Sequence, residues 1–149
     1  MRIFVDADAC PVKDIVIEVC EKYQVAVVLV CSVSHYSPYS TELVEYIIVD
    51  NIPQAADMAI VNRIKKGDIL ITQDYGLASL VLSRGCVVLH HTGKRYTLKN
   101  IDNLLIKRHI AQKIRRGGGR TAGPKAFTKE DRLKFREALE KVVLELKKE

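Results

Sequence analysis

The sequence contains no long hydrophobic run, no C-x-x-C cysteine pair and few aromatic residues. No apolar run reaches the roughly 18 residues that a membrane-spanning helix needs, so no membrane association is expected. The N-terminus does not resemble a signal peptide, because Asp6 and Asp8 interrupt its apolar stretch almost at once. Without an export signal, the four cysteines are expected to be buried reduced thiols and not disulfides or zinc ligands. These absences predict a cytoplasmic protein.

The chain has 149 residues, of which 48% are hydrophobic and 28% charged, so one soluble globular domain is expected. Its net charge of +6 is unevenly distributed. Residues 1–106 contain 10 Lys and Arg against 12 Asp and Glu, whereas residues 107–149 contain 14 against 6. A basic C-terminal third favours a polyanionic partner, although a solvated basic helix is the simpler explanation.

Apolar periodicity predicts strands that alternate with helices, which is typical of an α/β fold with right-handed crossovers. We expect a three-layer domain over residues 1–149, with a mainly parallel sheet of four to five strands and helices on both faces. An α/β body would occupy residues 1–106, followed by a basic glycine-rich loop and a C-terminal helix over 107–149. The expected strands are 2–6, 25–31, 45–50, 68–73 and 86–90. One helix is expected after Pro11, a second from Pro53 to Lys66, a third from 76 to 84 and a fourth from about Asn100 to Arg116. A last helix is expected to begin near Thr128, where T-K-E-D resembles a capping box.

Aspartates follow or face the carboxyl ends of these strands, where functional groups of parallel α/β sheets gather. Asp6 ends the first strand, Asp8 lies just beyond it, Asp74 follows the fourth strand, and Asp57 lies in the first turns of a helix. Asp68 begins the fourth strand, about 20 Å from Asp74, and is excluded from this site. Clustered carboxylates without His or Cys favour Mg²⁺ or Mn²⁺, which promote phosphodiester cleavage, whereas capping of helices is the alternative role.

The segment around Gly117–Gly119 is flanked by Arg116 and Arg120, with Thr121 and Lys125 close behind. Glycine allows backbone N–H groups to approach phosphates closely, and arginine can grip them bidentately. A flexible linker to the last helix is the alternative interpretation. The consecutive His90 and His91 end the fifth strand, so at least one imidazole is expected to face the same edge, where it would contact phosphate or simply bond to the backbone.

Four segments carry a resemblance to a known family. These are DADACP at 6–11, Ala56-Asp57, GDILITQDYGLA at 67–78 and RGGGRTAGP at 116–124. They resemble the YaiI/YqxD family (the DUF188 group), which is similar to PIN-like domains, whose acidic clusters bind divalent metal and hydrolyse RNA or DNA. The resemblance extends over nearly the whole chain.

This resemblance implies a role for each matching residue. Asp6 corresponds to the first PIN-type acid, Asp57 to the helix acid and Asp74 to the acid after the fourth strand. Thr72 matches the hydroxyl residue that often precedes that last acid, which places it beside a bound phosphate. Asp8 is an addition to the PIN-like pattern.

The leading hypothesis is therefore a metal-dependent nuclease acting on RNA or single-stranded nucleic acid. Asp6, Asp8, Asp57 and Asp74 would hold Mg²⁺ or Mn²⁺, while the basic segment would hold phosphate. One alternative is a phosphatase of the haloacid-dehalogenase type with Asp6 as nucleophile, because Asp6-x-Asp8 after a first strand is its opening motif. Another is a non-catalytic RNA-binding module that uses the basic C-terminal third.

Overall fold

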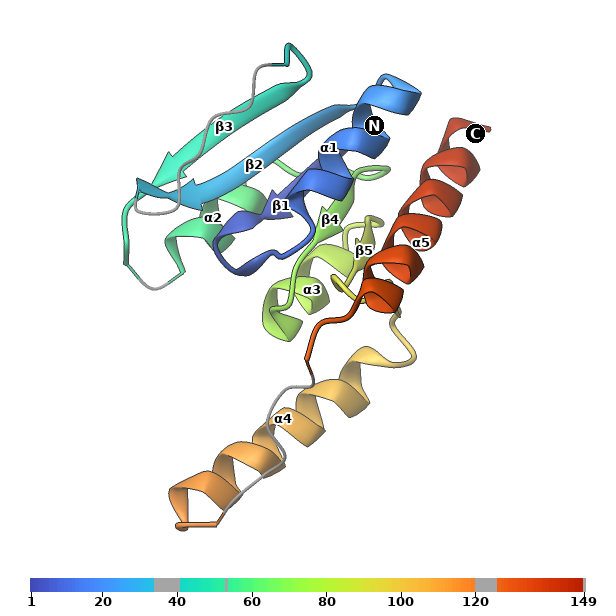
Figure 1. Cartoon of the computed structure of the whole chain (residues 1–149). Coiled ribbons are helices and arrows are strands. Elements are labelled where there is room, and N and C mark those ends of the chain that lie inside the picture. Colours follow the sequence, from blue (N-terminus) through green and yellow to red (C-terminus); the bar gives the residue numbers. More distant parts are fainter. Residues whose placement is uncertain (34–40, 53, 120–125, 149) are drawn as a thin grey trace.

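A computed structural model describes residues 1–33, 41–52, 54–119 and 126–148. They form one sheet of six strands in the order β3-β2-β1-β4-β5-β6, in which the first five are parallel and β6 is antiparallel to β5 (Figure 1). The expected α/β class with a mainly parallel sheet is confirmed. The strands are β1 (Arg2–Asp6), β2 (Ala26–Ser32), β3 (Val44–Val49), β4 (Ile69–Ile71), β5 (Val87–Leu89) and β6 (Arg95–Tyr96).

Helices cover both faces of the sheet. One core packs α1 and α5 against the side chains of Ile3, Val5 and Leu29, and the other packs α2, α3 and the start of α4 against Phe4 and Val28. This alternation explains the continuous apolar runs of β1 and β2, because both faces of these strands are buried. The helices are α1 (Lys13–Tyr23), α2 (Ala55–Val61), α3 (Tyr75–Leu82), α4 (Ile101–Arg116) and α5 (Lys129–Lys147), with a 3-10 turn η1 (Ala7–Ala9).

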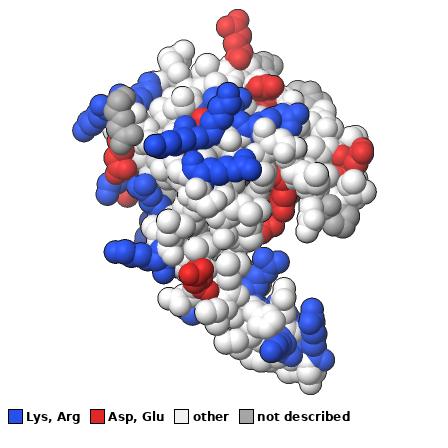
Figure 2. All heavy atoms as spheres, turned by 180° about the vertical axis from the view of Figure 1, so that it is seen from behind, with Lys and Arg blue, Asp and Glu red and all other residues white. Residues whose placement is uncertain are grey.

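The helix α4 leaves the body of the molecule soon after it begins. Its first turns pack against the core, through Ile101, Leu104 and Leu105. Figures 1 and 2 both show the remainder of α4 projecting away from the sheet. Among the described residues, no helix combines the length and the apolar character needed to cross a bilayer.

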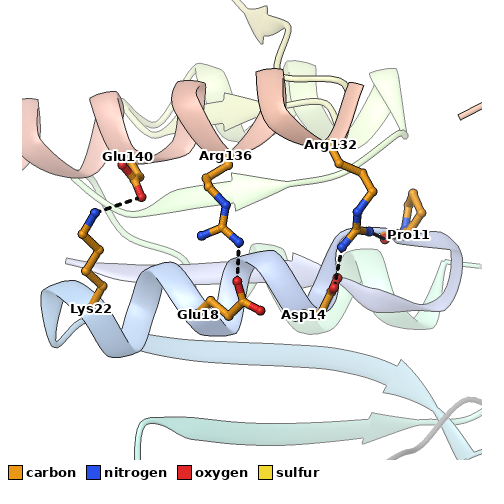
Figure 3. A network of polar contacts seen from close by, with 7 residues as sticks. All are labelled: Pro11, Asp14, Glu18, Lys22, Arg132, Arg136 and Glu140. Atoms are coloured by element: carbon orange, nitrogen blue, oxygen red, sulfur yellow. Dashed lines mark hydrogen bonds and ion pairs between the residues drawn. The ribbon is translucent and has the colours of Figure 1, made fainter. Parts of the chain in front are cut away.

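The helix α5 packs along α1, as shown in Figure 3. The expected capping box at its start is confirmed, because the Thr128 hydroxyl accepts a hydrogen bond from the Asp131 N–H while the Asp131 carboxylate accepts one from Thr128 N–H. Ion pairs join Arg132 to Asp14, Arg136 to Glu18, and Lys22 to Glu140 across the two helices.

The apolar side of α5 carries its attachment to the core. Phe135, Leu139 and Val143 are fully buried there. Helical spacing in the sequence predicts that Leu133 faces the same packing surface, and this prediction is wrong, because that side chain is 61% exposed. Leu133 lies on the helix flank beside Arg132 and Arg136 and not on the stripe formed by residues 135, 139, 142 and 143.

The end of α2 and the number of strands differ from those expected. The helix α2 ends at Val61 and not at Lys66, because residues 62–67 form turns that bring Lys65 N–H to the Asp68 carboxylate at 2.9 Å. The short strand β6 was not anticipated, since two residues carry no periodicity. Gly93, with a φ of +90°, makes the turn that returns the chain beside β5.

Candidate functional site

The first two acids lie at the ends of neighbouring strands. Asp6 ends β1 and Asp74 follows β4, and these strands pair in parallel, so both residues reach the same edge. The buried Thr72 joins them: its hydroxyl donates to Asp6 Oδ2 at 3.0 Å and accepts from the Asp74 N–H at 3.0 Å. Thr72 therefore positions both acids, because its hydroxyl donates to one of them and accepts from the backbone of the other.

Asp74 also caps the helix α3. Its Oδ1 accepts a hydrogen bond from the Leu77 N–H at 3.1 Å, so the capping role expected as an alternative is present. Gly76 leaves room for this carboxylate, because a Cβ there would lie 3.2 Å from Asp74 Oδ1. Arg108 of α4 approaches the same oxygen at 3.8 Å. The cap of α3 and the ion pair with Arg108 thus both involve the Oδ1 atom of Asp74.

Asp57 approaches from the first turn of α2 and completes a group of three carboxylates. Partial burial, the charges of Asp74 and Asp6, and a hydrogen bond with Asp74 raise its pKa to about 6. Burial, followed by the charges of Asp74 and Asp8, also raises the pKa of Asp6, against the lowering effect of the Thr72 hydrogen bond. Asp6, Asp57 and Asp74, which we call the carboxylate group, therefore share one electrostatic field.

Asp8 lies at the margin of this group. It belongs to the 3-10 turn after β1, and its Oδ1 accepts a hydrogen bond from the Ser32 N–H at 2.8 Å at the end of β2. Its charge nevertheless helps to raise the pKa of Asp6. Asp8 also lines a hollow of about 390 Å³ together with Asp50 and Asp57.

A larger groove of about 750 Å³ opens on the other side of Asp57, between α2, α3 and α4. Acidic Asp57 and Asp74 line it together with Arg108, and the exposed apolar side chains of Met58 and Leu80 lie farther along. We call this hollow the α2–α3 groove. Its lining comprises Gln54, Asp57, Met58, Val61, Asn62, Asp74, Gly76, Leu77, Leu80 and Arg108.

The histidines lie behind the carboxylate group. His91 borders a small cavity of about 10 Å³ with Asp6, Cys10 and Thr72, and its buried Nδ1 has no hydrogen-bond partner among the described residues. His90 stacks on it with ring centroids 4.0 Å apart, and its Nδ1 lies 2.8 Å from the Thr92 hydroxyl. Burial lowers the pKa of His90 to about 4, so this imidazole is neutral near pH 7.

Cys10, on the same small cavity, is a poor nucleophile. Burial raises the pKa of its thiol to about 11, so the thiol stays protonated at neutral pH. Within the parts of the chain that the structure describes, the four cysteines are all free.

The carboxylate group suits a hydrated cation better than an enclosed one. Among the described side chains, no set of three or more His, Cys, Asp or Glu is arranged to hold a metal ion. Mg²⁺, however, commonly binds through one or two carboxylates and keeps several waters or phosphate oxygens. The adjacent Asp57 and Asp74 provide hard oxygen ligands of this kind, and burial followed by the charge of Asp74 raises the pKa of Asp57.

The basic residues expected around the glycine-rich segment are only partly described. Arg116 lies at the exposed distal end of α4, about 12 Å along the helix from Arg108. Arg120, Thr121 and Lys125 lie outside the described residues.

Arg108 was not anticipated as a site residue. Only the packing of α4 against α3 places its guanidinium beside Asp74, and its position within a basic helix gave no such signal. Asp68 lies on the opposite edge as expected, where its carboxylate accepts hydrogen bonds from the N–H groups of Arg2 and Lys65.

Comparison with known proteins places the chain among bacterial relatives. The chain is 55% identical over 136 residues to a UPF0178 protein of Oceanobacillus iheyensis, covering 91% of this chain and 93% of that one. It is 55% identical over 144 residues to a UPF0178 protein of Enterococcus faecalis, covering 96% and 97% of the two chains. No solved structure matches it. Residues 4–145 match the profile described as "Uncharacterized BCR, YaiI/YqxD family", and the chain therefore belongs to the YaiI/YqxD family.

Proposed function

We propose that this protein is a divalent-metal-dependent phosphodiester hydrolase that acts on RNA or single-stranded nucleic acid in the cytoplasm. The observation that carries the proposal is the carboxylate group, in which acids from three distant segments meet, so that burial and the repulsion of neighbouring carboxylates raise the pKa of Asp6 and of Asp57. Such repulsion is relieved by a proton or by a cation, and hard oxygen ligands favour Mg²⁺ or Mn²⁺.

The residues of the site have separate parts in this proposal. Asp57 and Asp74 border the α2–α3 groove and would hold the cation, while Thr72 keeps Asp6 and Asp74 in register. A bound Mg²⁺ or Mn²⁺ supplies activated water and neutralises charge on phosphate oxygens. Arg108, at the same groove, would pair with a phosphate oxygen of the substrate.

The test is cleavage of end-labelled RNA and single-stranded DNA by the purified protein in Mg²⁺ or Mn²⁺. Asp6→Asn, Asp57→Asn and Asp74→Asn are each expected to reduce the rate at least about 100-fold, because each removes charge from the metal environment. As a control, Asp102→Asn removes an exposed acid of α4 that lies outside the carboxylate group, and it should leave the rate unchanged. Cleavage that persists in the three variants at the wild-type rate contradicts the site.

The same preparation separates the alternative activities. A phosphatase with Asp6 as nucleophile would form a trappable aspartyl-phosphate, which a metal-dependent hydrolase does not. A non-catalytic RNA-binding module would bind RNA with a steep salt dependence that survives loss of every carboxylate in the group.

A further inference from the structure

We propose that the substrate of the activity proposed above is a single nucleic-acid strand that lies along the α2–α3 groove. Its phosphates would be held at the far end by four basic residues, Arg63, Lys65, Lys66 and Arg84, which we call the basic edge. This inference concerns how the site takes its substrate and rests on the proposed function.

The basic edge is assembled from two turns at the opposite edge of the sheet from the carboxylate group. One turn follows α2 and the other follows α3, and a hydrogen bond from the Gly67 N–H to the Gly85 carbonyl joins them. The aliphatic stem of Lys66 lies over Gly85, and Arg84 donates to the Val61 carbonyl. All four basic side chains are exposed. Figure 2 shows Lys and Arg side chains grouped on the upper part of the face seen from behind.

The charge of this edge is not cancelled locally. Asp68 is the nearby acid, but it is buried, accepts hydrogen bonds from two backbone N–H groups and lies 3.8 Å from the Arg2 guanidinium. Among the described residues, no ion pair joins a member of the basic edge to a carboxylate. Four uncompensated cations attract the phosphates of a nucleic acid.

The α2–α3 groove runs from the carboxylate group toward the basic edge, and its lining ends at Val61 and Asn62, directly before Arg63. Both helices start at the carboxylate group, with Asp57 in the first turn of α2 and Asp74 capping α3, and both end at the basic edge. Val61, Asn62 and Leu80 line the groove between the ends. Asp74 follows Asp68 by six positions in the segment that contains β4, a span of about 20 Å. This length corresponds to about six nucleotides at a stacked rise of 3.4 Å.

The lining between the two charged ends favours a single strand. Met58 and Leu80 are 64% and 58% exposed and would face the bases of an unpaired strand. A duplex presents its phosphates outward and buries its bases between them, so it cannot bring bases against these side chains.

The experiment measures binding separately from cleavage. Fluorescein-labelled oligothymidylates of 3, 6 and 12 nucleotides are titrated with the full chain in EDTA, so that no metal supports hydrolysis. The test variant combines Lys65→Gln, Lys66→Gln and Arg84→Gln. Its control combines Lys99→Gln, Lys129→Gln and Lys141→Gln, which remove the same charge from exposed positions elsewhere.

Loss of the basic edge is expected to weaken binding of the 12-mer at least about tenfold and to lower the slope of log affinity against log salt by about 2. Binding of the 3-mer should hardly change, because it is too short to reach from one end of the groove to the other. The control variant should bind all three oligonucleotides within about threefold of wild type, since its charges lie away from the groove.

Several results overturn the strand path. The first is a loss of 12-mer affinity in the control variant that equals the loss in the test variant. The second is tighter binding of duplex than of single strand, and the third is a loss of 3-mer affinity in the test variant that equals its loss of 12-mer affinity. Binding to phosphatidylserine vesicles that depends on the same three residues while oligonucleotide binding does not would assign the edge to a membrane.

The two proposals fail in different ways. Binding with the expected length dependence but without metal-supported cleavage contradicts the hydrolase and leaves the strand path standing. Cleavage of the 12-mer at the wild-type rate by the test variant contradicts the strand path and leaves the hydrolase standing.

Discussion

The two faces of the sheet are built differently. On one face, α1 and α5 are long, their apolar stripes are fully buried, and ion pairs cross between them (Figure 3). On the other face, α2 and α3 have 7 and 8 residues, and Gln54, the N-cap of α2, lies in the left-handed region (φ 67°). A groove of about 750 Å³ remains between the helices.

The α1–α5 face therefore contributes mainly to stability, whereas the opposite face carries the groups suited to chemistry. On the α1–α5 face, ion pairs join the two helices and the apolar stripe of α5 is buried. The opposite face keeps repelling carboxylates and exposed apolar side chains such as Met58, all of which lower stability unless something binds there. Substitutions on the first face should therefore cost stability, whereas some substitutions on the second should increase it.

The largest effect is expected from the core of the α1–α5 face. Phe135→Ala removes a fully buried ring and should lower the free energy of unfolding by about 3–5 kcal/mol, measured by urea denaturation. Leu133→Ala on the same helix changes an exposed side chain and should cost less than about 0.5 kcal/mol. Similar losses for both would contradict the described orientation of α5.

The next effect concerns the contact between the β5–β6 turn and α5. Gly93→Ala should lower the free energy of unfolding by about 2 kcal/mol, because its Cβ would lie 2.8 Å from the Lys134 carbonyl oxygen and the φ of +90° is unfavourable. Gly67→Ala is the matched control, since its φ is +89° but no atom lies within 4 Å of its Cβ. Thermal unfolding should show the larger loss for Gly93, and equal losses would remove the close contact.

On the opposite face, neutralising a carboxylate should increase stability. The pKa of Asp57 is about 6 in the native protein and near 3.8 when unfolded, so its contribution to the free energy of unfolding falls as pH rises through that window. Asp57→Asn should thus raise stability at pH 7 by about 1 kcal/mol, after allowance for solvent screening of this half-buried group. Urea denaturation should show the gain shrinking toward pH 4. A gain independent of pH would contradict the raised pKa of Asp57.

A divalent cation should remove the same repulsion. Mg²⁺ or Mn²⁺ at about five times its dissociation constant should stabilise the wild-type protein by about 1 kcal/mol, followed as a rise in the thermal midpoint. Asp57→Asn and Asp74→Asn should lose this rise, whereas Asp102→Asn should keep it. An equal rise in all variants would assign the effect to other sites.

The smallest effect is expected from the ion pairs of the α1–α5 face. Arg136→Gln breaks the exposed pair with Glu18 and should lower the free energy of unfolding by about 0.2–1 kcal/mol, with the difference vanishing in high salt. A double-mutant cycle with Glu18→Gln measures it. A coupling well above 1 kcal/mol would show that charge pairing, and not the apolar stripe, holds α5.

Local patterns predicted much of this architecture. Three features are confirmed: the apolar runs of β1 and β2, the capping box at Thr128, and the position of Asp68 at the opposite edge. Each of them depends on neighbours in the sequence or on strand direction. The short β6 depends on pairing with β5 and carries no period of its own.

The site was less accessible to such patterns. The positions of Asp6 and Asp74 follow from the rule that parallel strands end at one edge, and Thr72 lies between them. Arg108 reaches Asp74 only through the packing of α4 on α3, and the basic edge unites turns that are about 20 residues apart. The charge count of the first 106 residues is negative and concealed this local excess of cations.

The attachment of α5 to α1 has a consequence for the order of folding. The hydrophobic cluster beneath α1 includes Phe135, Leu139, Val142 and Val143, which are made after everything else in that cluster. During synthesis, β1 and β2 therefore have one face uncovered until α5 has emerged from the ribosome. Over that interval the nascent chain exposes apolar surface of the kind that chaperones bind.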